Sequence, residues 1–273
     1  MKLVQKKIEG FPMVLNLDDG GISRRLWLKG KREQAFMWIL RQQTGGTALD
    51  IGGNIGYCTL SLARNFEHVV AVEPDPRSLK VLYENIKLNK LENVKLENFA
   101  FSDKCEDRTI NLAPKPNLTS FKRTEGELYT LRTMTIDAYL RGKPVSFMKM
   151  DVEGSEIEVI AGAKRTIERH KPSILLEVHP AEYKGDDFKN TLLGLVEQGY
   201  RIPYVVSAKV DRDKFKVPKL FKQKGYKPYM KFNDLKRAVF KDIAIEDAIE
   251  WSSREIEDRH SKKIVRAILL EAK

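Results

Sequence analysis

The chain has 273 residues, of which 42% are hydrophobic, so it can form one large domain or one domain with a modest appendage. No apolar run approaches the roughly 18 residues of a membrane span and the N-terminus has no signal-peptide core, which favours a soluble, cytoplasmic protein. The two cysteines, Cys58 and Cys105, are too few for a disulfide framework and lack metal-ligand spacing, so we interpret both as buried, reduced thiols.

The net charge of +11 is concentrated in one segment. Residues 201–241 contain 13 lysines and arginines against three aspartates, while the rest of the chain is nearly neutral. Aromatic residues are interleaved with the cations of residues 209–241, namely Phe215, Phe221, Tyr226, Tyr229 and Phe232. This pattern predicts a surface for nucleic acid, an anionic glycan or lipid head groups, with a solvated lysine-rich face as the alternative.

Helix and strand patterns alternate along most of the chain. The expected elements are a hairpin over residues 11–30 around Asp18-Asp19-Gly20-Gly21, a helix over 33–43, a strand before Asp50, a helix over 55–66, a strand over 69–72, a helix from Pro74 and Pro76 to Asn89, and a strand over 94–99. After a polar segment, 102–132, that suggests loops or a hairpin beside the site, the expected elements are a strand over 146–152, a helix over 155–170, a strand over 173–178, a helix over 187–198, a strand over 201–206, and helices over 233–250 and 252–272.

This alternation predicts an α/β fold with a doubly wound, mostly parallel, Rossmann-like sheet. We expect a domain over residues 1–206, whose first 46 residues form an N-terminal hairpin and helix. We expect residues 207–273 to form a basic, helical C-terminal extension. An apolar stripe in the last predicted helix could also support a homo-oligomer, although packing on the parent domain is the expected use.

The glycine-rich segment Asp50-Ile-Gly-Gly-Asn-Ile-Gly56 follows the first core strand. It fits neither the dinucleotide pattern G-x-G-x-x-G nor a P-loop, because no lysine follows Gly56 to reach a phosphate. A carboxylate at the strand end suits the amine of S-adenosylmethionine, and Glu73, at the end of the next strand, could hold a ribose diol. An ordinary strand-to-helix turn is the alternative, since glycine and asparagine both tolerate positive φ.

Polar residues follow the other predicted strands as well. Parallel strands place their carboxyl ends at one edge of the sheet, so these residues should converge. They are Ser102 and Asp103 after the third strand, Asp151 and Glu153 after the fourth, and Glu177 and His179 after the fifth.

The chain resembles the FkbM family of S-adenosylmethionine-dependent methyltransferases. The matching segments are Asp50 to Gly56, Val72-Glu-Pro-Asp-Pro76, Met134-Thr-Ile-Asp-Ala-Tyr139, Lys149-Met-Asp-Val-Glu-Gly-Ser-Glu156, Gly162-Ala163 and Glu177-Val-His179, in the family's order. The resemblance implies a class I methyltransferase fold, S-adenosylmethionine as cofactor, and O-methylation of a hydroxyl. The predicted cofactor-binding residues are Asp50, Gly52, Gly53, Asn54, Gly56, Glu73, Pro74, Ser102 and Asp103.

Methyl transfer needs an acceptor aligned with the methyl group and a group that helps to remove the acceptor's proton. The predicted catalytic residues are Asp151, Glu153, Lys149, Glu177 and His179, with Asp151 the first candidate and Lys149 expected on its face of the strand. Asp151 could instead bind cofactor or cap the following helix, and Glu153 could simply suit the helix dipole. We assign no metal; the alternative is a divalent ion held by the acidic cluster and His179.

These features predict an O-methyltransferase acting on a glycan, lipid or small metabolite. The alternative is an RNA methyltransferase that binds RNA through residues 209–241. A third possibility is a non-enzymatic interaction module, against which the intact acidic constellation argues.

Overall fold

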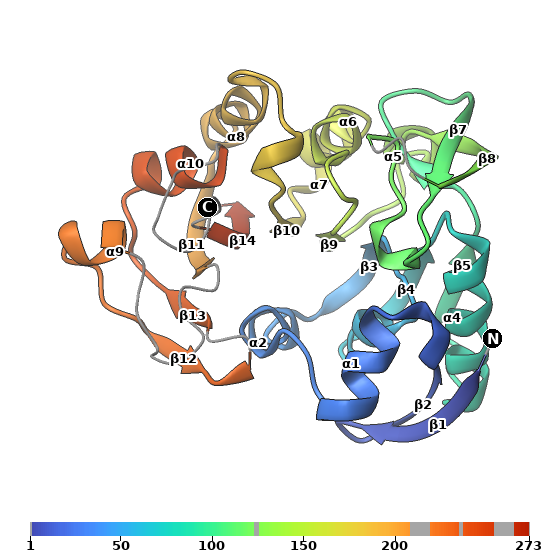
Figure 1. Cartoon of the computed structure of the whole chain (residues 1–273). Helices are drawn as coiled ribbons and strands as arrows, with labels where there is room; N and C mark the ends of the chain where they lie inside the picture. The colour runs from blue at the N-terminus through green and yellow to red at the C-terminus, as the bar shows by residue number, and fades with distance from the viewer. Residues whose placement is uncertain (1, 123–125, 208–218, 235–236, 254–264, 273) are drawn as a thin grey trace.

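The computed structural model describes residues 2–122, 126–207, 219–234, 237–253 and 265–272 (Figure 1). Its main feature is a nine-stranded sheet. In spatial order the strands are β12 (Met230–Phe232), β13 (Arg237–Phe240), β11 (Tyr200–Ser207), β14 (Val265–Ala272), β10 (Ser173–Glu177), β9 (Phe147–Met150), β3 (Gly45–Ile51), β4 (Phe66–Val72) and β5 (Val94–Glu97).

The half of the sheet from β10 to β5 is parallel. Helices cover both faces, which is why alternate residues of β3 and β4 enter two different apolar clusters. One face carries α2 (Gln34–Arg41) and α3 (Tyr57–Leu62); the other carries α5 (Ile136–Leu140), α6 (Glu156–Ala161), α7 (Lys164–His170), α8 (Asp187–Glu197) and α10 (Ile245–Ser253). The predicted doubly wound α/β fold is confirmed.

The helix expected over 155–170 is two helices, α6 and α7, separated at Gly162. A Cβ at this glycine would lie 2.0 Å from the backbone oxygen of Ser102, so the chain there packs too closely for any side chain. The contact holds the α6–α7 junction against the segment that follows the short strand β6 (Ala100–Phe101).

The C-terminal segment differs most from expectation. Of the predicted helix 252–272, Ser252 and Ser253 belong to the end of α10, and residues 265–272 form strand β14, which pairs antiparallel with β10 on one side and β11 on the other. The helix predicted over 233–250 is strand β13 followed by α10, and α9 (Lys219–Gln223) precedes β12. The predicted helices are therefore wrong for β13 and β14, whereas α10 agrees with the end of the helix predicted over 233–250. The boundary at residue 206 stays a prediction, while strands from both sides of it share one sheet.

The N-terminal hairpin lies earlier than predicted. Strands β1 (Leu3–Ile8) and β2 (Phe11–Asn16) turn at Glu9 and Gly10, whose φ angles are 49° and 92°. The segment Asp18 to Gly21 instead leads into α1 (Ile22–Lys29), because both Asp19 carboxylate oxygens accept backbone N–H groups at the helix start. The hairpin and α1 pack beside α4 (Pro76–Leu88), as Figure 1 shows.

The polar segment after β6 forms the expected hairpin. Strands β7 (Asp107–Leu112) and β8 (Glu127–Met134) pair antiparallel, and β6 joins β8 to make a small separate sheet. Among the helices described, none is long and apolar enough to cross a membrane.

Candidate active site

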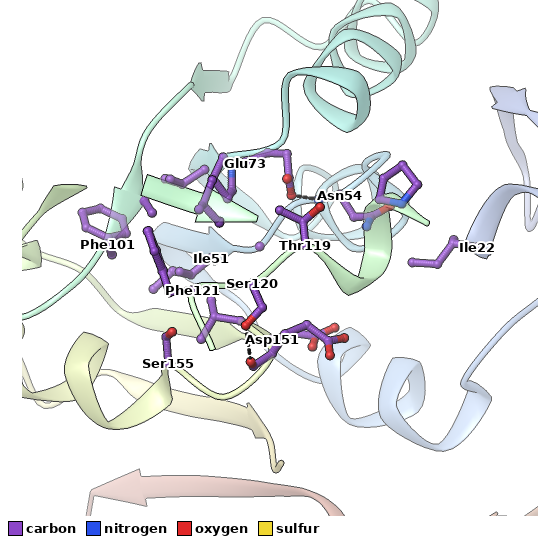
Figure 2. A pocket seen from close by; sticks show the side chains of 18 of the residues that line it. Ile22, Ile51, Asn54, Glu73, Phe101, Thr119, Ser120, Phe121, Asp151 and Ser155 are labelled. Atoms are coloured by element: carbon purple, nitrogen blue, oxygen red, sulfur yellow. Dashed lines mark hydrogen bonds between the residues drawn. The ribbon is translucent and has the colours of Figure 1, made fainter. Parts of the chain in front are cut away.

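A pocket of about 780 Å³ opens at the carboxyl ends of β3, β4 and β9 (Figure 2). Figure 2 shows Glu73 and Thr119 on one side and Asp151 on the other. The lining residues are Ile22, Arg32, Ile51, Gly52, Asn54, Val72, Glu73, Pro74, Ala100, Phe101, Ile110, Pro116, Thr119, Ser120, Phe121, Asp151, Val152, Glu153, Ser155 and Arg266.

The glycine loop forms one wall of this pocket. Gly52 has φ 81°, and a Cβ there would lie 2.1 Å from the backbone oxygen of Asp151, so the loop can pass this close to the end of β9 only with glycine. Asn54 also has positive φ, at 48°, which asparagine tolerates. Gly53 and Gly56 pack against Leu82 of α4 and do not line the pocket.

Glu73 is buried at the wall opposite Asp151. Its Oε2 accepts the backbone N–H of Asn54 at 2.7 Å, and its Oε1 accepts that of Asp75 at 2.8 Å. Burial raises the pKa of Glu73 to about 7, although the two N–H donors act in the opposite direction. The carboxylate is thus fixed in position and exposed only to the pocket.

Asp50 and Lys149 form a buried ion pair beneath the loop. Lys149 Nζ lies 3.1 Å from Asp50 Oδ1 and donates to the backbone oxygen of Gly52 at 2.6 Å. Burial alone would lower the pKa of Lys149, but the nearby acidic groups, of which Asp50 contributes most, together outweigh burial and hold that pKa above its usual value. Thr59 donates to the other oxygen of Asp50 at 2.7 Å. Neither residue of the pair lines the pocket, and both brace the glycine loop from below.

Four carboxylates converge on His179 beside the pocket. Its Nδ1 lies 2.9 Å from Glu156 Oε1, and its Nε2 lies 3.4 Å from Glu177, 3.9 Å from Asp151 and 4.0 Å from Glu153. Of this cluster, Asp151 and Glu153 line the pocket. Asp151 Oδ1 is buried on the His179 side and accepts no hydrogen bond from the described residues, while the Asp151 side chain as a whole is 30% exposed and lines the pocket.

The cluster also has the composition of a cation site. Ligand atoms of Asp151, Glu177 and His179 lie within 4.8 Å of one another. Arg266 of β14 ion-pairs with Glu177 and also lies 3.3 Å from Glu33. A divalent ion would compete with this guanidinium for Glu177.

The segment before and after η2 (Pro116–Leu118) covers the pocket. The buried carboxylate of Asp75 accepts a hydrogen bond of 2.7 Å from the hydroxyl of Thr119 and forms an ion pair with Arg77. Arg77 also donates a hydrogen bond of 2.7 Å to the backbone oxygen of Ala113. Ser120 Oγ donates to the backbone oxygen of Glu153 at 2.9 Å. These contacts tie the covering segment to both α4 and the end of β9.

The predicted site residues divide into three groups. Gly52, Asn54, Glu73, Pro74, Asp151 and Glu153 line the pocket, whereas Asp50, Gly53, Gly56, Lys149, Glu177 and His179 support it from behind. Ser102 and Asp103 follow the lining residue Phe101 without reaching the pocket, and the Ser102 hydroxyl is held by Arg108 at 3.0 Å.

Sequence reasoning missed several lining residues. Ile22 comes from the segment interpreted as a hairpin, Arg32 from the short connection between that hairpin and the helix predicted over 33–43, and Arg266 from the segment interpreted as a helix. The signal that could have found the apolar walls is the strand itself, because Ile51 and Val72 directly precede the polar strand-end residues.

The thiols lie elsewhere. Cys58 is half-buried in α3, and Cys105 is exposed, contrary to its predicted burial. Neither lines the pocket.

The profile of the methyltransferase FkbM domain matches residues 50–202, which is more than half of the chain. The chain belongs to the FkbM methyltransferase family. The predicted resemblance is thereby confirmed, and S-adenosylmethionine is identified as the cofactor. A solved FkbM methyltransferase from Methylobacillus flagellatus has a TM-score of 0.45 and 21% identity, over 59% of this chain and 40% of that one.

Curated relatives of this FkbM chain include RNA-modifying enzymes. A tRNA/tmRNA (uracil-C(5))-methyltransferase of Vibrio atlanticus is 29% identical over 151 residues, which are 54% of this chain and 40% of the relative. A tRNA(Phe) (4-demethylwyosine(37)-C(7)) aminocarboxypropyltransferase of Methanocaldococcus jannaschii is 33% identical over 75 residues, 27% of this chain and 30% of the relative. The chain thus spans less than half the length of these relatives.

Proposed function

We propose that this protein transfers the methyl group of S-adenosylmethionine to an oxygen or nitrogen atom of an RNA. The observation that carries the proposal is that one pocket is lined by both the fixed carboxylate of Glu73 and the partly exposed side chain of Asp151. The first suits a nucleoside, and the second suits an acceptor that must lose a proton.

The polar and apolar groups that line the pocket fit the cofactor. Glu73 would accept hydrogen bonds from the two ribose hydroxyls, as a carboxylate at the second strand end does in nucleotide-binding folds. Ile51, Val72 and Phe101 offer apolar walls for the adenine ring, and the backbone at Gly52 and Asn54 would approach the methionine portion. The bound cofactor supplies an electrophilic methyl group; the remaining work belongs to the protein.

That work is to align the acceptor and accept its proton. The carboxylate of Asp151, which lines the pocket, would accept a proton from a hydroxyl or an N–H group, and Glu153 also belongs to the lining. Methylation of an unactivated ring carbon requires a nucleophile, such as a thiolate, that first adds to the ring. Since neither cysteine lines the pocket, an oxygen or nitrogen acceptor fits better than uracil C5.

RNA is favoured as the substrate class by the relatives, which are named as tRNA-modifying enzymes. The second candidate is O-methylation of a hydroxyl on a glycan, lipid or small metabolite. It is supported by the same Asp151 geometry, which suits any hydroxyl that fits the pocket.

The test has two arms. Calorimetry should detect binding of S-adenosylmethionine to the wild type and lose it in Glu73→Ala, while Glu67→Ala, an exposed carboxylate on β4, should bind normally. Methyl-labelled cofactor, added with wild-type protein to total RNA and to a lysate, should give label that RNase releases. Label that resists RNase and fractionates with glycan, lipid or small molecules would reject RNA in favour of the second candidate.

A further inference from the structure

A second hollow, of about 1,090 Å³, lies beside the active-site pocket and is strongly basic. Four exposed cations line it: Arg24, Arg25 and Lys29 of α1, and Lys115 from the segment that covers the pocket. The Lys115 side chain reaches to within 3.7 Å of the Cβ position of Gly20, at the start of α1, so the two walls approach each other there. We call this hollow, defined by these four cations, the α1 groove.

The cations of the α1 groove lack acidic partners. None of the four forms an ion pair with the residues that the structure describes. Arg25 and Lys29 are four residues apart on one helix, where like charges repel and destabilise the helix. Burial and the nearby cations Arg32, Arg237 and Arg266 lower the pKa of Arg25, with Glu33 as the opposing charge. The groove therefore carries unneutralised positive charge at a cost to stability.

The α1 groove is continuous with the pocket. Arg32 lines both hollows. The covering segment also contributes to both, since Lys115 and Leu118 face the groove while Pro116 and Thr119 face the pocket. A polymer lying in the groove would thus pass beside the entrance to the pocket.

We propose that the α1 groove binds the phosphodiester backbone of single-stranded RNA and presents a nucleotide to the pocket. This inference rests on the proposed function and names the surface that holds its substrate. Unpaired cations along a groove track a phosphate backbone without reading its sequence. Leu28, which is 65% exposed and lines the groove, adds an apolar surface between the cations.

A concave surface favours the binding of a single strand of RNA over the binding of a membrane, because the flat array of lipid head groups cannot enter a hollow. Charge density alone does not distinguish the groove, since the region of α5 and α7 also carries exposed cations: Arg141, Lys143, Lys164 and Arg169. The hollow near these residues shares no lining residue with the active-site pocket. This second patch therefore provides a matched control.

The test measures RNA binding without cofactor, by fluorescence anisotropy with fluorescein-labelled poly(U). The groove variant combines Arg24→Gln, Arg25→Gln, Lys29→Gln and Lys115→Gln. The control variant combines Arg141→Gln, Lys143→Gln, Lys164→Gln and Arg169→Gln. Circular dichroism and calorimetric binding of S-adenosylmethionine establish that each variant is folded.

We expect the groove variant to bind poly(U) at least about tenfold more weakly than wild type at ~50 mM salt, and the control variant to bind within about twofold. The slope of log K against log salt should become shallower by about 0.7 for each removed phosphate contact. Equal binding by wild type and groove variant, or an equal loss in the control, would overturn the inference. So would a groove-dependent affinity for phosphatidylserine vesicles without one for poly(U).

Label transfer separates this inference from the proposed function. RNase-sensitive label together with normal poly(U) binding by the groove variant would reject the groove alone. Groove-dependent poly(U) binding without label in RNA would reject the proposed reaction and leave the groove as an RNA-binding surface.

Discussion

Asp50 lies near the end of β3 and Glu73 directly follows the neighbouring strand β4, yet their carboxylates face different surroundings. Asp50 is neutralised by Lys149 beneath the glycine loop, whereas Glu73 faces the pocket and is held only by backbone N–H groups. We therefore expect the ionisation of Glu73 to control ligand binding near neutral pH.

The raised pKa of Glu73 predicts that the free energy of unfolding falls as the pH rises. The pKa of Glu73 is about 7 in the folded protein and 4.5 in the usual, solvated state. The stability that protonated Glu73 contributes is therefore complete below pH 4.5 and is lost as the pH rises through about 7. The free energy of unfolding of the cofactor-free protein should fall by roughly 3 kcal/mol from this group. Denaturant titrations across this pH range, with Glu73→Gln as reference, measure the loss.

Cofactor affinity should change with pH in the opposite sense, because only the ionised carboxylate accepts both ribose hydroxyls. From about pH 8 to about pH 6, calorimetry should show the affinity of wild type for S-adenosylmethionine weakening about tenfold more than that of Glu73→Gln. Parallel pH profiles for the two proteins would show that Glu73 does not bind the cofactor.

Gly52 offers a test of loop geometry. Gly52→Ala would force a side chain into positive φ and against the backbone oxygen of Asp151, so we expect a loss of at least about 3 kcal/mol in the free energy of unfolding. Gly194, inside α8 with open space at its Cβ position, is the matched control. Gly194→Ala should gain about 0.5 to 1 kcal/mol. Urea denaturation of both variants would decide, and a mild effect at Gly52 would contradict the tight packing.

The sequence identified the residues of the site better than their orientation. Strand ends locate Asp50, Glu73 and Asp151 correctly at one edge, because a parallel sheet places them there. Which carboxylate faces solvent depends on its partner across the sheet. The pairing of Asp50 with Lys149 joins residues 99 positions apart, and no local pattern carries that information.

At the scale of elements, β14 was mistaken for a helix for a physical reason. Its residues Val265, Ala267, Ile268, Leu269 and Leu270 are buried because both faces of the strand are covered. A strand buried on both faces has a continuous apolar run, which periodicity cannot distinguish from a buried helix. The parallel strands were predicted correctly because each is bounded by turn residues and followed by a clear helix pattern.

The two faces of β14 can be tested separately. Ile268 and Leu269 point into different apolar clusters, so Ile268→Ala and Leu269→Ala should each cost about 2 to 5 kcal/mol. Leu128→Ala, at a position 70% exposed on β8, should stay within about 0.5 kcal/mol. Chemical denaturation supplies all three values; a small effect at either β14 position would argue that its face is solvated.

For the whole molecule, the described cations are more widely spread than the sequence suggested. Of the C-terminal basic segment, residues 208–218 and 235–236 lie outside the described residues. Arg237 is buried beside Glu33, and Phe221, one of the aromatic residues interleaved with the cations of this segment, is fully buried in the core. Residues 24–32 contain five cations and no acidic residue. This basic segment was not predicted from the sequence, because the C-terminal segment accounts for almost the whole net charge.

This distribution predicts unequal effects on RNA binding. Lys222 and Lys227 are exposed lysines of the C-terminal segment that make no described ion pair. Lys222→Gln with Lys227→Gln should weaken poly(U) binding by less than about threefold, whereas Arg24→Gln with Arg25→Gln should weaken it more. Anisotropy titrations of the two double variants at equal salt compare them directly, and the reverse ranking would return the RNA surface to the C-terminal segment.

The position of β14 has a consequence for biosynthesis. Among the described strands of the sheet it is the last that the ribosome makes, yet its place is between β10 and β11, which are made earlier. During translation those two strands must leave a gap one strand wide, or pair with each other and separate again. Arg266 lies on this last strand, so the ion pair between Arg266 and Glu177 cannot form until β14 has been synthesised. The nascent chain can therefore complete the carboxylate cluster around His179 only after β14 has paired with β10.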